Sequence, residues 1–244
     1  QLLPDPADPQ LLAAVRLLDV HRADRELARL FPAISRRHTS RHPFEDRAIP
    51  ALVREALSDA AEQEGTRLVF PDRWHTESLL DHVRDAEGRD SADAAYLEEM
   101  RSWTRVGATE TATARDGIPD YAFGPARRGV RAPVRDFAGR RPLPGRPTAV
   151  FETAPNLALL GTTHDRPADW LRAGEAMERV LLLATLHGLA TSLTSHSLER
   201  HDLRELARDP ASAMGFVQMV LRLGYGPAGT ASPRRHVDEV LEIV

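Results

Sequence analysis

Apolar residues recur at the spacing of an amphipathic helix in several separate stretches of the chain. The expected helices cover 9–30, 50–65, 76–100, 168–187 and 202–207. The first of these makes residues 1–31 an N-terminal helical segment that begins at Asp8–Pro9 and stops at Phe31–Pro32. The stretch 168–187 has the broadest apolar face and ends at a glycine, so it is expected to be a buried central helix.

Short runs of apolar and β-branched residues between these helices predict strands. The runs cover 67–70, 148–153, 157–161, 190–194 and 216–224, and the last run is the strongest. Helices and strands are interspersed without a regular βαβ alternation, which favours an α+β fold over a doubly wound one. We expect a single domain over residues 1–244.

The periodic pattern is lost between Trp103 and Pro147, where glycine, proline and arginine are frequent. A loop of this length inside a compact domain is usually a lid, a binding loop or a disordered segment. Aromatic and aliphatic side chains within it, such as Tyr121, Phe123 and Phe137, could anchor it to the rest of the protein. We therefore expect 103–147 to be a lid or insertion loop.

Composition excludes several classes of function. The net charge of −4 is unlike that of a nucleic-acid-binding protein, and no apolar run is long enough to cross a membrane. With no cysteine and no lysine, the chain has no thiolate nucleophile, Schiff-base lysine or Walker-type phosphate lysine. No secretory signal opens the sequence, so we expect a cytoplasmic protein, although a start at Gln1 suggests a fragment or a processed chain.

Common catalytic and metal-binding patterns are missing, and we expect no metal and no catalytic acid or base. The sequence contains no Gly-x-Ser-x-Gly or His-Glu-x-x-His motif, and the glycines that follow the last strand, Gly224 and Gly226, are interpreted as a turn because no helix follows them. His38 and His42 are four residues apart but lie among arginines that would repel a cation. His196 and His201 flank Glu199, a spacing that any surface turn can produce.

An arginine cluster carries the clearest candidate chemistry. Arg36, Arg37 and Arg41 lie with His38, Thr39 and Ser40, and guanidinium groups with hydroxyls suit a phosphate monoester. Arg234 and Arg235 follow the last strand and would complete a dianion site if the two segments converge. The alternative is that both segments are solvated basic turns.

Three motifs, in order along the chain, resemble the FMN-dependent nitroreductase family. Arg37-His38-Thr39-Ser40-Arg41 with Phe44 is similar to the N-terminal element that holds the FMN phosphate and ribityl chain in that family. The run Gly188–Ser195 resembles the short strand whose following loop passes the flavin, and 221–226 with 233–240 resembles the closing strand, turn and arginine. The resemblance implies cofactor-binding roles for Arg37, His38, Thr39, Arg41, Thr194, Ser195, His196, Arg234 and Arg235. It also implies a nitroreductase-like fold, with a mostly antiparallel sheet around the central helix and flanking helices.

One family segment, Pro-Ser-x-x-Asn-x-Gln-Pro-Trp, has no counterpart in the chain. The N-terminal run 2–9 and the lid-like 116–119 look most like the Acg branch, whose members are fused pairs of nitroreductase halves. In that branch the absent segment lies upstream of the point where this sequence begins. We therefore expect a homodimer, or a pseudo-dimer whose N-terminal half is missing.

The resemblance implies that FMN accepts a hydride from NAD(P)H and passes electrons to a nitro compound or a quinone. In the Acg branch a lid can instead cover the flavin and exclude nicotinamide, which would make the protein an FMN-binding or storage module with little turnover. A third possibility is a flavin-free helical scaffold with an anion-binding turn.

Overall fold

The computed structural model describes residues 1–16, 25–129, 134–139, 141–209, 211–212 and 214–242. Its α-helices are α1 (Arg25–Ile34), α2 (Ala51–Glu62), α3 (Arg73–Ala92), α4 (Ala94–Ser102), α5 (Ala108–Thr113), α6 (Pro167–Leu186) and α7 (His201–Leu206). Three 3-10 helices are η2 (Asp120–Ala122), η3 (His196–Glu199) and η4 (Val237–Glu239). Among the described helices, none is long and apolar enough to cross a membrane.

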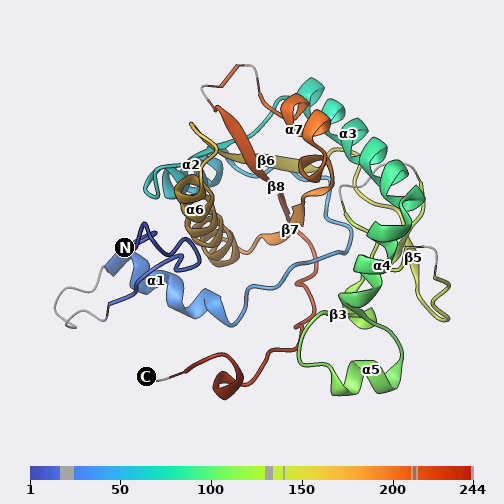
Figure 1. Cartoon of the computed structure of the whole chain (residues 1–244). Coiled ribbons are helices and arrows are strands. Elements are labelled where there is room, and N and C mark those ends of the chain that lie inside the picture. Colours follow the sequence, from blue (N-terminus) through green and yellow to red (C-terminus); the bar gives the residue numbers. More distant parts are fainter. Residues whose placement is uncertain (17–24, 130–133, 140, 210, 213, 243–244) are drawn as a thin grey trace.

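A four-stranded antiparallel sheet forms the centre of the protein (Figure 1), in the order β1-β6-β8-β7. Its strands are β1 (Arg67–Val69), β6 (Asn156–Thr162), β7 (Ala190–Thr194) and β8 (Phe216–Gly224). Two small parallel pairs lie apart from this sheet, and their strands are β2 (Thr104–Arg105), β3 (Ile118–Pro119), β4 (Ala126–Arg127) and β5 (Thr148–Ala149). The expected α+β class with a mostly antiparallel sheet is confirmed.

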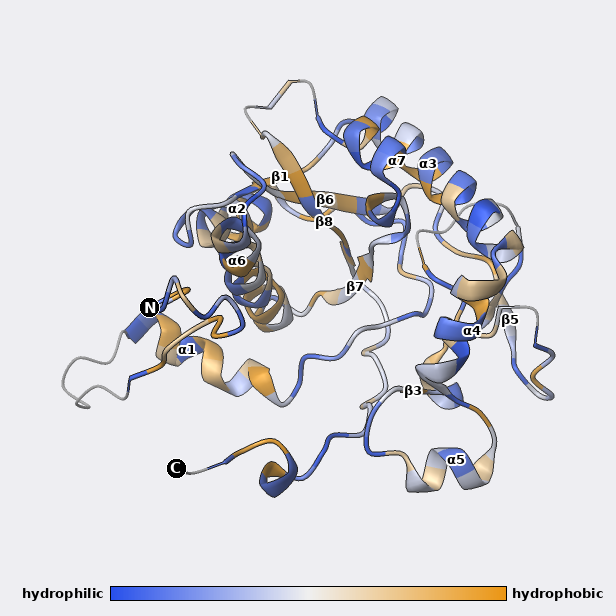
Figure 2. Cartoon of the chain, viewed as in Figure 1, coloured by the Kyte–Doolittle hydropathy of each residue, from blue (hydrophilic) through white to orange (hydrophobic). Residues whose placement is uncertain are grey.

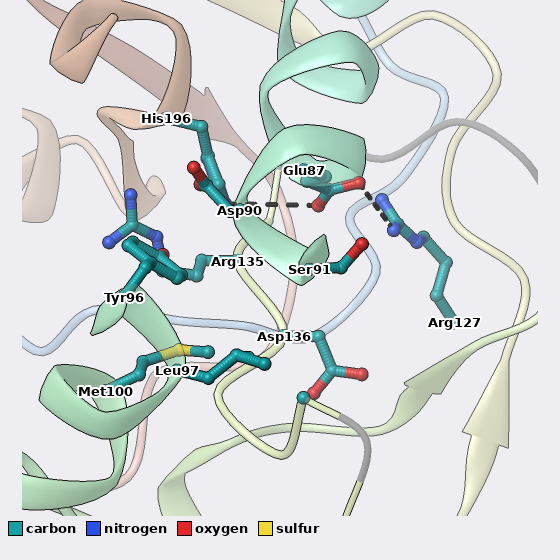
Figure 3. A pocket seen from close by; sticks show the side chains of 11 residues that line it. Glu87, Asp90, Ser91, Tyr96, Leu97, Met100, Arg127, Arg135, Asp136 and His196 are labelled. Carbon is teal, nitrogen blue, oxygen red and sulfur yellow. Dashed lines mark hydrogen bonds and ion pairs between the residues drawn. The ribbon is translucent and has the colours of Figure 1, made fainter. Parts of the chain in front are cut away.

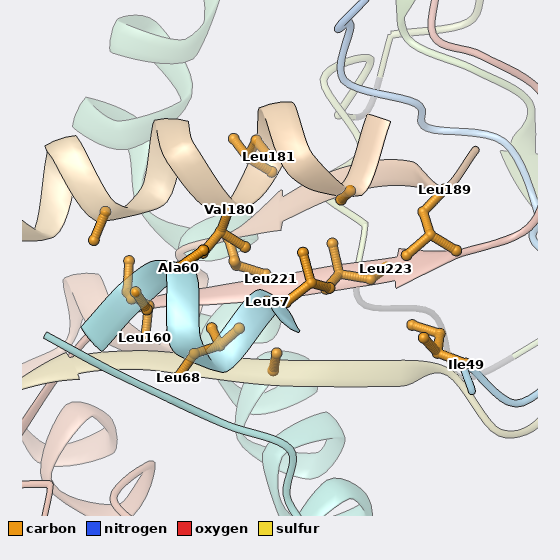
Figure 4. Packing of buried hydrophobic residues seen from close by; sticks show 14 residues of the cluster. Ile49, Leu57, Ala60, Leu68, Leu160, Val180, Leu181, Leu189, Leu221 and Leu223 are labelled. Atoms are coloured by element: carbon orange, nitrogen blue, oxygen red, sulfur yellow. The ribbon is translucent and has the colours of Figure 1, made fainter. Parts of the chain in front are cut away.

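The larger hydrophobic cluster lies between one face of the sheet and helices α2 and α6. Val180 of α6 and Leu57 of α2 are fully buried there against Leu221 of β8 (Figure 4). Helix α6 ends where the sequence predicts, because Gly188 adopts a positive φ of 72° that L residues rarely take. Its outer face is only partly covered, and Trp170 is 51% exposed.

The opposite face of the sheet packs on α3 and α7. Leu79 and Leu80 of α3 meet Leu159 of β6 and Val220 of β8 in a second buried cluster. Figure 2 shows the apolar strands enclosed between helices whose outer surfaces are largely hydrophilic. Because the sheet is covered on both faces, β6 and β8 read as nearly continuous apolar runs, which explains why the sequence predicts them well.

The expected N-terminal helix over 9–30 is wrong over 9–16 and is confirmed over 25–30. Residues 1–16 are irregular, and a single bridge pairs Leu2 with Ala13. The side chains of Asp5 and Asp8 accept hydrogen bonds from backbone N–H groups two residues ahead, which competes with helix formation. Helix forms only over α1, which continues through Pro32, and residues 17–24 lie outside the described part.

Two further expectations need correction. The helical stretch 76–100 is two helices, because the Asp93 side chain accepts from the N–H groups of Ala95 and Tyr96 and thereby begins α4. The strand expected over 148–153 is reduced to β5, since the residues after it turn towards a buried ion pair.

The segment 103–147 is described except at 130–133 and 140. It contains β2, α5, β3, η2 and β4, joined by irregular stretches. Phe123 is 1% exposed and Val134 is 8% exposed, so this segment is anchored by apolar side chains. Its function as a lid stays a prediction.

Candidate functional site

Three segments that are far apart in the sequence meet at the beginning of β7. Thr39 forms a parallel bridge with Thr191, and the Ser40 N–H donates to the Thr191 carbonyl at 2.8 Å. The Ser40 hydroxyl donates to the Pro227 carbonyl at 2.7 Å. A Cβ on Gly229 would lie 2.2 Å from the Thr39 carbonyl oxygen, so only glycine allows this close approach.

Arg41 lies beneath the 103–147 segment. Its Nη1 donates to the Ala122 carbonyl at 3.0 Å, and its guanidinium carbon lies 4.8 Å from the centroid of the Phe137 ring. Burial lowers the pKa of Arg41 to about 10, so the side chain stays cationic at neutral pH. The residue thus presents a desolvated positive charge near β7.

The other residues of the N-terminal motif are less enclosed. Arg37 forms an ion pair with Glu178 of α6 at 3.3 Å, and its side chain is 20% exposed. His38 and Thr39 are half-buried. Because the ion pair with Glu178 is partly exposed, it is weak, and an anion could compete for the Arg37 guanidinium.

The loop after β7 is held by polar contacts. Thr194 is fully buried, and the Ser195 hydroxyl donates to Glu199 Oε1 at 2.8 Å. Arg135, from the 103–147 segment, donates to the same Glu199 oxygen at 2.6 Å. His196, the next residue, lines a cavity beside α3.

The C-terminal arginines have other partners. Arg234 is exposed, and its Nη1 donates to the Ser232 hydroxyl at 2.6 Å. Arg235 forms an ion pair with Asp116 at 2.8 Å, and Asp116 also pairs with Arg105. The backbone of the C-terminal turn therefore reaches Thr39, while the guanidinium groups of Arg234 and Arg235 engage their own loop and the 103–147 segment.

A buried ion pair holds the backbone that follows the basic motif 37–41. Arg222 of β8 is fully buried, and it donates to Glu152 through Nε at 2.5 Å and through Nη2 at 2.7 Å. Glu152 also accepts the Phe44 N–H at 2.9 Å, and Arg222 Nη2 donates to the His42 carbonyl at 3.0 Å. The pair thus fixes the backbone of 42–44, immediately after Arg41.

A cavity of about 250 Å³ lies between α3, α4, η3 and the 103–147 segment (Figure 3). Burial lowers the pKa of His196 to about 3, and the positive charges of Arg135 and Arg127 act in the same direction. Burial raises the pKa of Glu87, and its hydrogen bond with Arg127 opposes this shift. Desolvation raises the pKa of Tyr96 to about 12, with the charges of Asp90 and Glu199 acting in the same direction and that of Arg135 opposing them.

Neither histidine pair considered from the sequence forms a metal site with neighbouring carboxylates. Across the residues that the structure describes, no group of three or more His, Asp or Glu side chains could hold a metal ion. His196 is buried, whereas His201 is exposed at the start of α7.

A protein-family model described as the nitroreductase family matches residues 34–225. The chain belongs to the nitroreductase family. The match covers the N-terminal motif, the sheet and the loop after β7, and stops before the C-terminal arginines.

Two proteins of Mycobacterium tuberculosis are similar over nearly the whole chain. One is named "Putative NAD(P)H nitroreductase acg"; it is 32% identical over 98% of this chain and 72% of its own length. The other is an uncharacterized protein that is 29% identical over 98% of this chain and 70% of its own length. The crystal structure of a nitroreductase with bound FMN from Bacteroides fragilis has a TM-score of 0.51 at 14% identity, covering 88% of this chain and 98% of that one. This likeness confirms the nitroreductase-like fold.

The sequence predicted the basic motif but missed Glu152 and Arg222, which fix the backbone after it, and Glu87, which lines the cavity beside α3. A signal existed for Arg222, because a charged residue in the middle of an apolar strand requires a buried partner. Local patterns gave no comparable signal for Glu87, which lies on a heavily charged helix.

Proposed function

We propose that the chain binds FMN at the junction of 37–41, the loop 194–196 and the C-terminal turn. The observation that carries this proposal is the bridge between Thr39 and Thr191, since it brings the basic motif alongside the strand that leads into the 194–196 loop. The donors there fit a flavin mononucleotide: two guanidinium groups suit its phosphate, and hydroxyl groups suit its ribityl chain. Relatives with bound FMN share the fold, which supports the choice of cofactor.

Each residue has a distinct role in this proposal. Arg37 would hold the phosphate by exchanging its exposed partner Glu178 for a dianion. Arg41, buried and cationic, would stabilise negative charge on the pyrimidine edge of the ring system. Thr194 and Ser195 would line the ring, and Arg234 could turn from Ser232 to the phosphate because its present contacts are exposed.

The reaction we propose is the NAD(P)H-dependent reduction of nitro compounds or quinones. FMN would supply the redox chemistry, while the protein binds the cofactor, orients it and excludes water. The relative named as an NAD(P)H nitroreductase supports this choice, and also supports placing the chain in the Acg branch. A second copy of the chain, or an upstream half, would complete the site as a dimer or pseudo-dimer.

Replacement of Arg37 by Ala tests the binding site. Loss of a charge-assisted contact with the phosphate should weaken FMN binding by at least about tenfold, measured by quenching of flavin fluorescence. Arg84→Ala is the matched control, because Arg84 makes only an exposed pair with Asp81 on α3. Equal FMN affinity for Arg37→Ala and the wild type would contradict the proposal.

A second candidate function is a lid-covered FMN-binding or storage protein. Contacts of Arg41 with Ala122 and Phe137 favour it, because they hold the 103–147 segment over the residue that would meet the flavin. Phe137→Ala removes one of these contacts. If the segment excludes nicotinamide, anaerobic NADPH should bleach the flavin of the wild type slowly and that of Phe137→Ala faster. Rapid bleaching of both proteins would favour the oxidoreductase.

A further inference from the structure

The cavity beside α3 is built differently from the proposed FMN site. One wall carries Glu87 and Asp90 of α3 together with His196 of η3, and the other carries Leu97 and Met100 of α4 (Figure 3). Polar groups thus face an apolar surface across a small space. Such an arrangement suits a ligand with one polar end and one apolar end.

Three side chains that line this cavity, His196, Glu87 and Asp90, have buried atoms without a hydrogen-bond partner among the described residues. Both ring nitrogens of His196 are without a hydrogen bond, although the side chain is only 2% exposed. Glu87 Oε2 accepts from Arg127 at 2.8 Å, while Oε1 has no hydrogen-bond partner in the described part of the chain. The distance from His196 Nε2 to Glu87 Oε1 is 3.9 Å, too long for a hydrogen bond.

These groups require mostly hydrogen-bond donors from a ligand. Burial keeps the His196 ring neutral at neutral pH, so it offers one acceptor and one donor. Burial raises the pKa of Glu87, while the ion pair of its Oε2 with Arg127 at 2.8 Å favours the carboxylate, whose Oε1 can only accept hydrogen bonds. A group with several N–H donors would satisfy both the imidazole and the carboxylate, whereas a second carboxylate would not.

The charges that line the cavity are matched in pairs. The carboxylates of Glu87, Asp90 and Asp136 pair with the guanidinium groups of Arg127, Arg200 and Arg146, and Arg135 pairs with Glu199. Among the described residues, Glu87 Oε1 and Asp90 Oδ2 have no hydrogen-bond partner, so the α3 side of the cavity offers acceptors to the N–H groups of a ligand.

We propose that this cavity binds a small primary ammonium compound. Its ammonium group would lie between Glu87 Oε1 and His196, and its short apolar body would lie against Leu97 and Met100. The volume corresponds to roughly eight water molecules, so an arylalkylamine as small as benzylamine is the right size. This site shares His196 with the loop of the proposed FMN site, whereas Arg37 and Arg41 lie outside its lining.

Benzylamine and benzyl alcohol are a matched pair of probes, alike in shape but different in charge. The chain has four methionines, so methyl-labelled methionine gives a small set of NMR signals, and Met100→Leu assigns the one in the cavity. We expect benzylamine to shift the Met100 methyl signal saturably and to bind at least tenfold more tightly than benzyl alcohol. Signals of the three other methionines should not move, because they lie outside the cavity lining.

Glu87→Gln keeps the shape of the side chain but removes its charge, and should weaken benzylamine binding at least tenfold. Glu77→Gln on the same helix is the control, since Glu77 makes an exposed pair with Arg73 and does not line the cavity. Arg37→Ala should weaken FMN binding but leave the affinity for benzylamine unchanged. The two binding proposals can therefore fail independently of each other.

Three results would overturn the ammonium site. They are equal binding of the alcohol and the amine, no saturable shift at Met100, and unchanged benzylamine affinity in Glu87→Gln. Should Glu87→Gln fail to fold, the comparison of the two probes on the wild-type protein still decides. An absent shift would mean that the cavity holds only water.

Discussion

Lowering the pH should decrease the free energy of unfolding because of His196, whose side chain is 2% exposed. Burial lowers its pKa from 6.5 to about 3, so the folded protein keeps the ring neutral in a range where the unfolded chain protonates it. Above pH 6.5 the ring is neutral in both states, and His196 does not reduce the free energy of unfolding. As the pH falls below 6.5, the unfolded chain takes up a proton that the folded protein does not, and the free energy of unfolding decreases.

The size of the loss follows from the shift. Each pH unit below the unfolded-state pKa costs about 1.4 kcal/mol, which gives about 2 kcal/mol at about pH 5 relative to about pH 8. His196→Gln keeps a neutral hydrogen-bonding side chain but cannot titrate. The raised pKa of Glu87 changes the free energy of unfolding with pH in the opposite sense. Glu87 is present in both the wild type and His196→Gln, so this change cancels in the comparison.

Urea unfolding followed by tryptophan fluorescence measures the effect at both pH values. The difference in the free energy of unfolding between wild type and His196→Gln should change by about 2 kcal/mol on acidification, to the disadvantage of the wild type. Parallel changes of the two proteins with pH would refute the reasoning, since they would mean that His196 protonates equally in the folded and unfolded states.

Glu152→Gln should destabilise the protein by about 3–5 kcal/mol in chemical unfolding, because it leaves the buried Arg222 charge uncompensated; a loss below about 1 kcal/mol would contradict this role. Gly229→Ala should loosen the C-terminal turn, since its new methyl group would collide with the Thr39 carbonyl, and limited trypsin digestion should then cut the C-terminal arginines faster. Gly88→Ala is the matched control, because a methyl group at this position of α3 would meet no atom within 4 Å. It should stabilise the protein by roughly 0.5–1 kcal/mol. Unchanged digestion of Gly229→Ala would argue against the close approach.

Strands and helices that pack on both sides of the sheet were predictable from the sequence. The strand 216–224 coincides with β8, and 168–187 differs from α6 by one residue at each end. Their apolar patterns reflect burial, and burial is what fixes these elements. The N-terminal segment misled the same reasoning, because Leu11, Leu12 and Val15 are apolar at helical spacing but exposed.

Residues of the candidate site were predictable only where they are neighbours in the sequence. The basic motif 37–41 is a local cluster, so its chemistry can be read directly. Glu152 and Arg222 are 70 positions apart, and their pairing depends on how β8 meets the segment after β5. The cavity between Glu87 and His196 likewise exists only once α3 packs against η3.

A crystal structure of this protein soaked with FMN would test the central claim most directly. The account predicts that the phosphate lies within hydrogen-bonding distance of Arg37 and that the ring system lies beside Arg41 and Ser195. Electron density for FMN elsewhere on the molecule, with Arg37 still paired to Glu178, would contradict it.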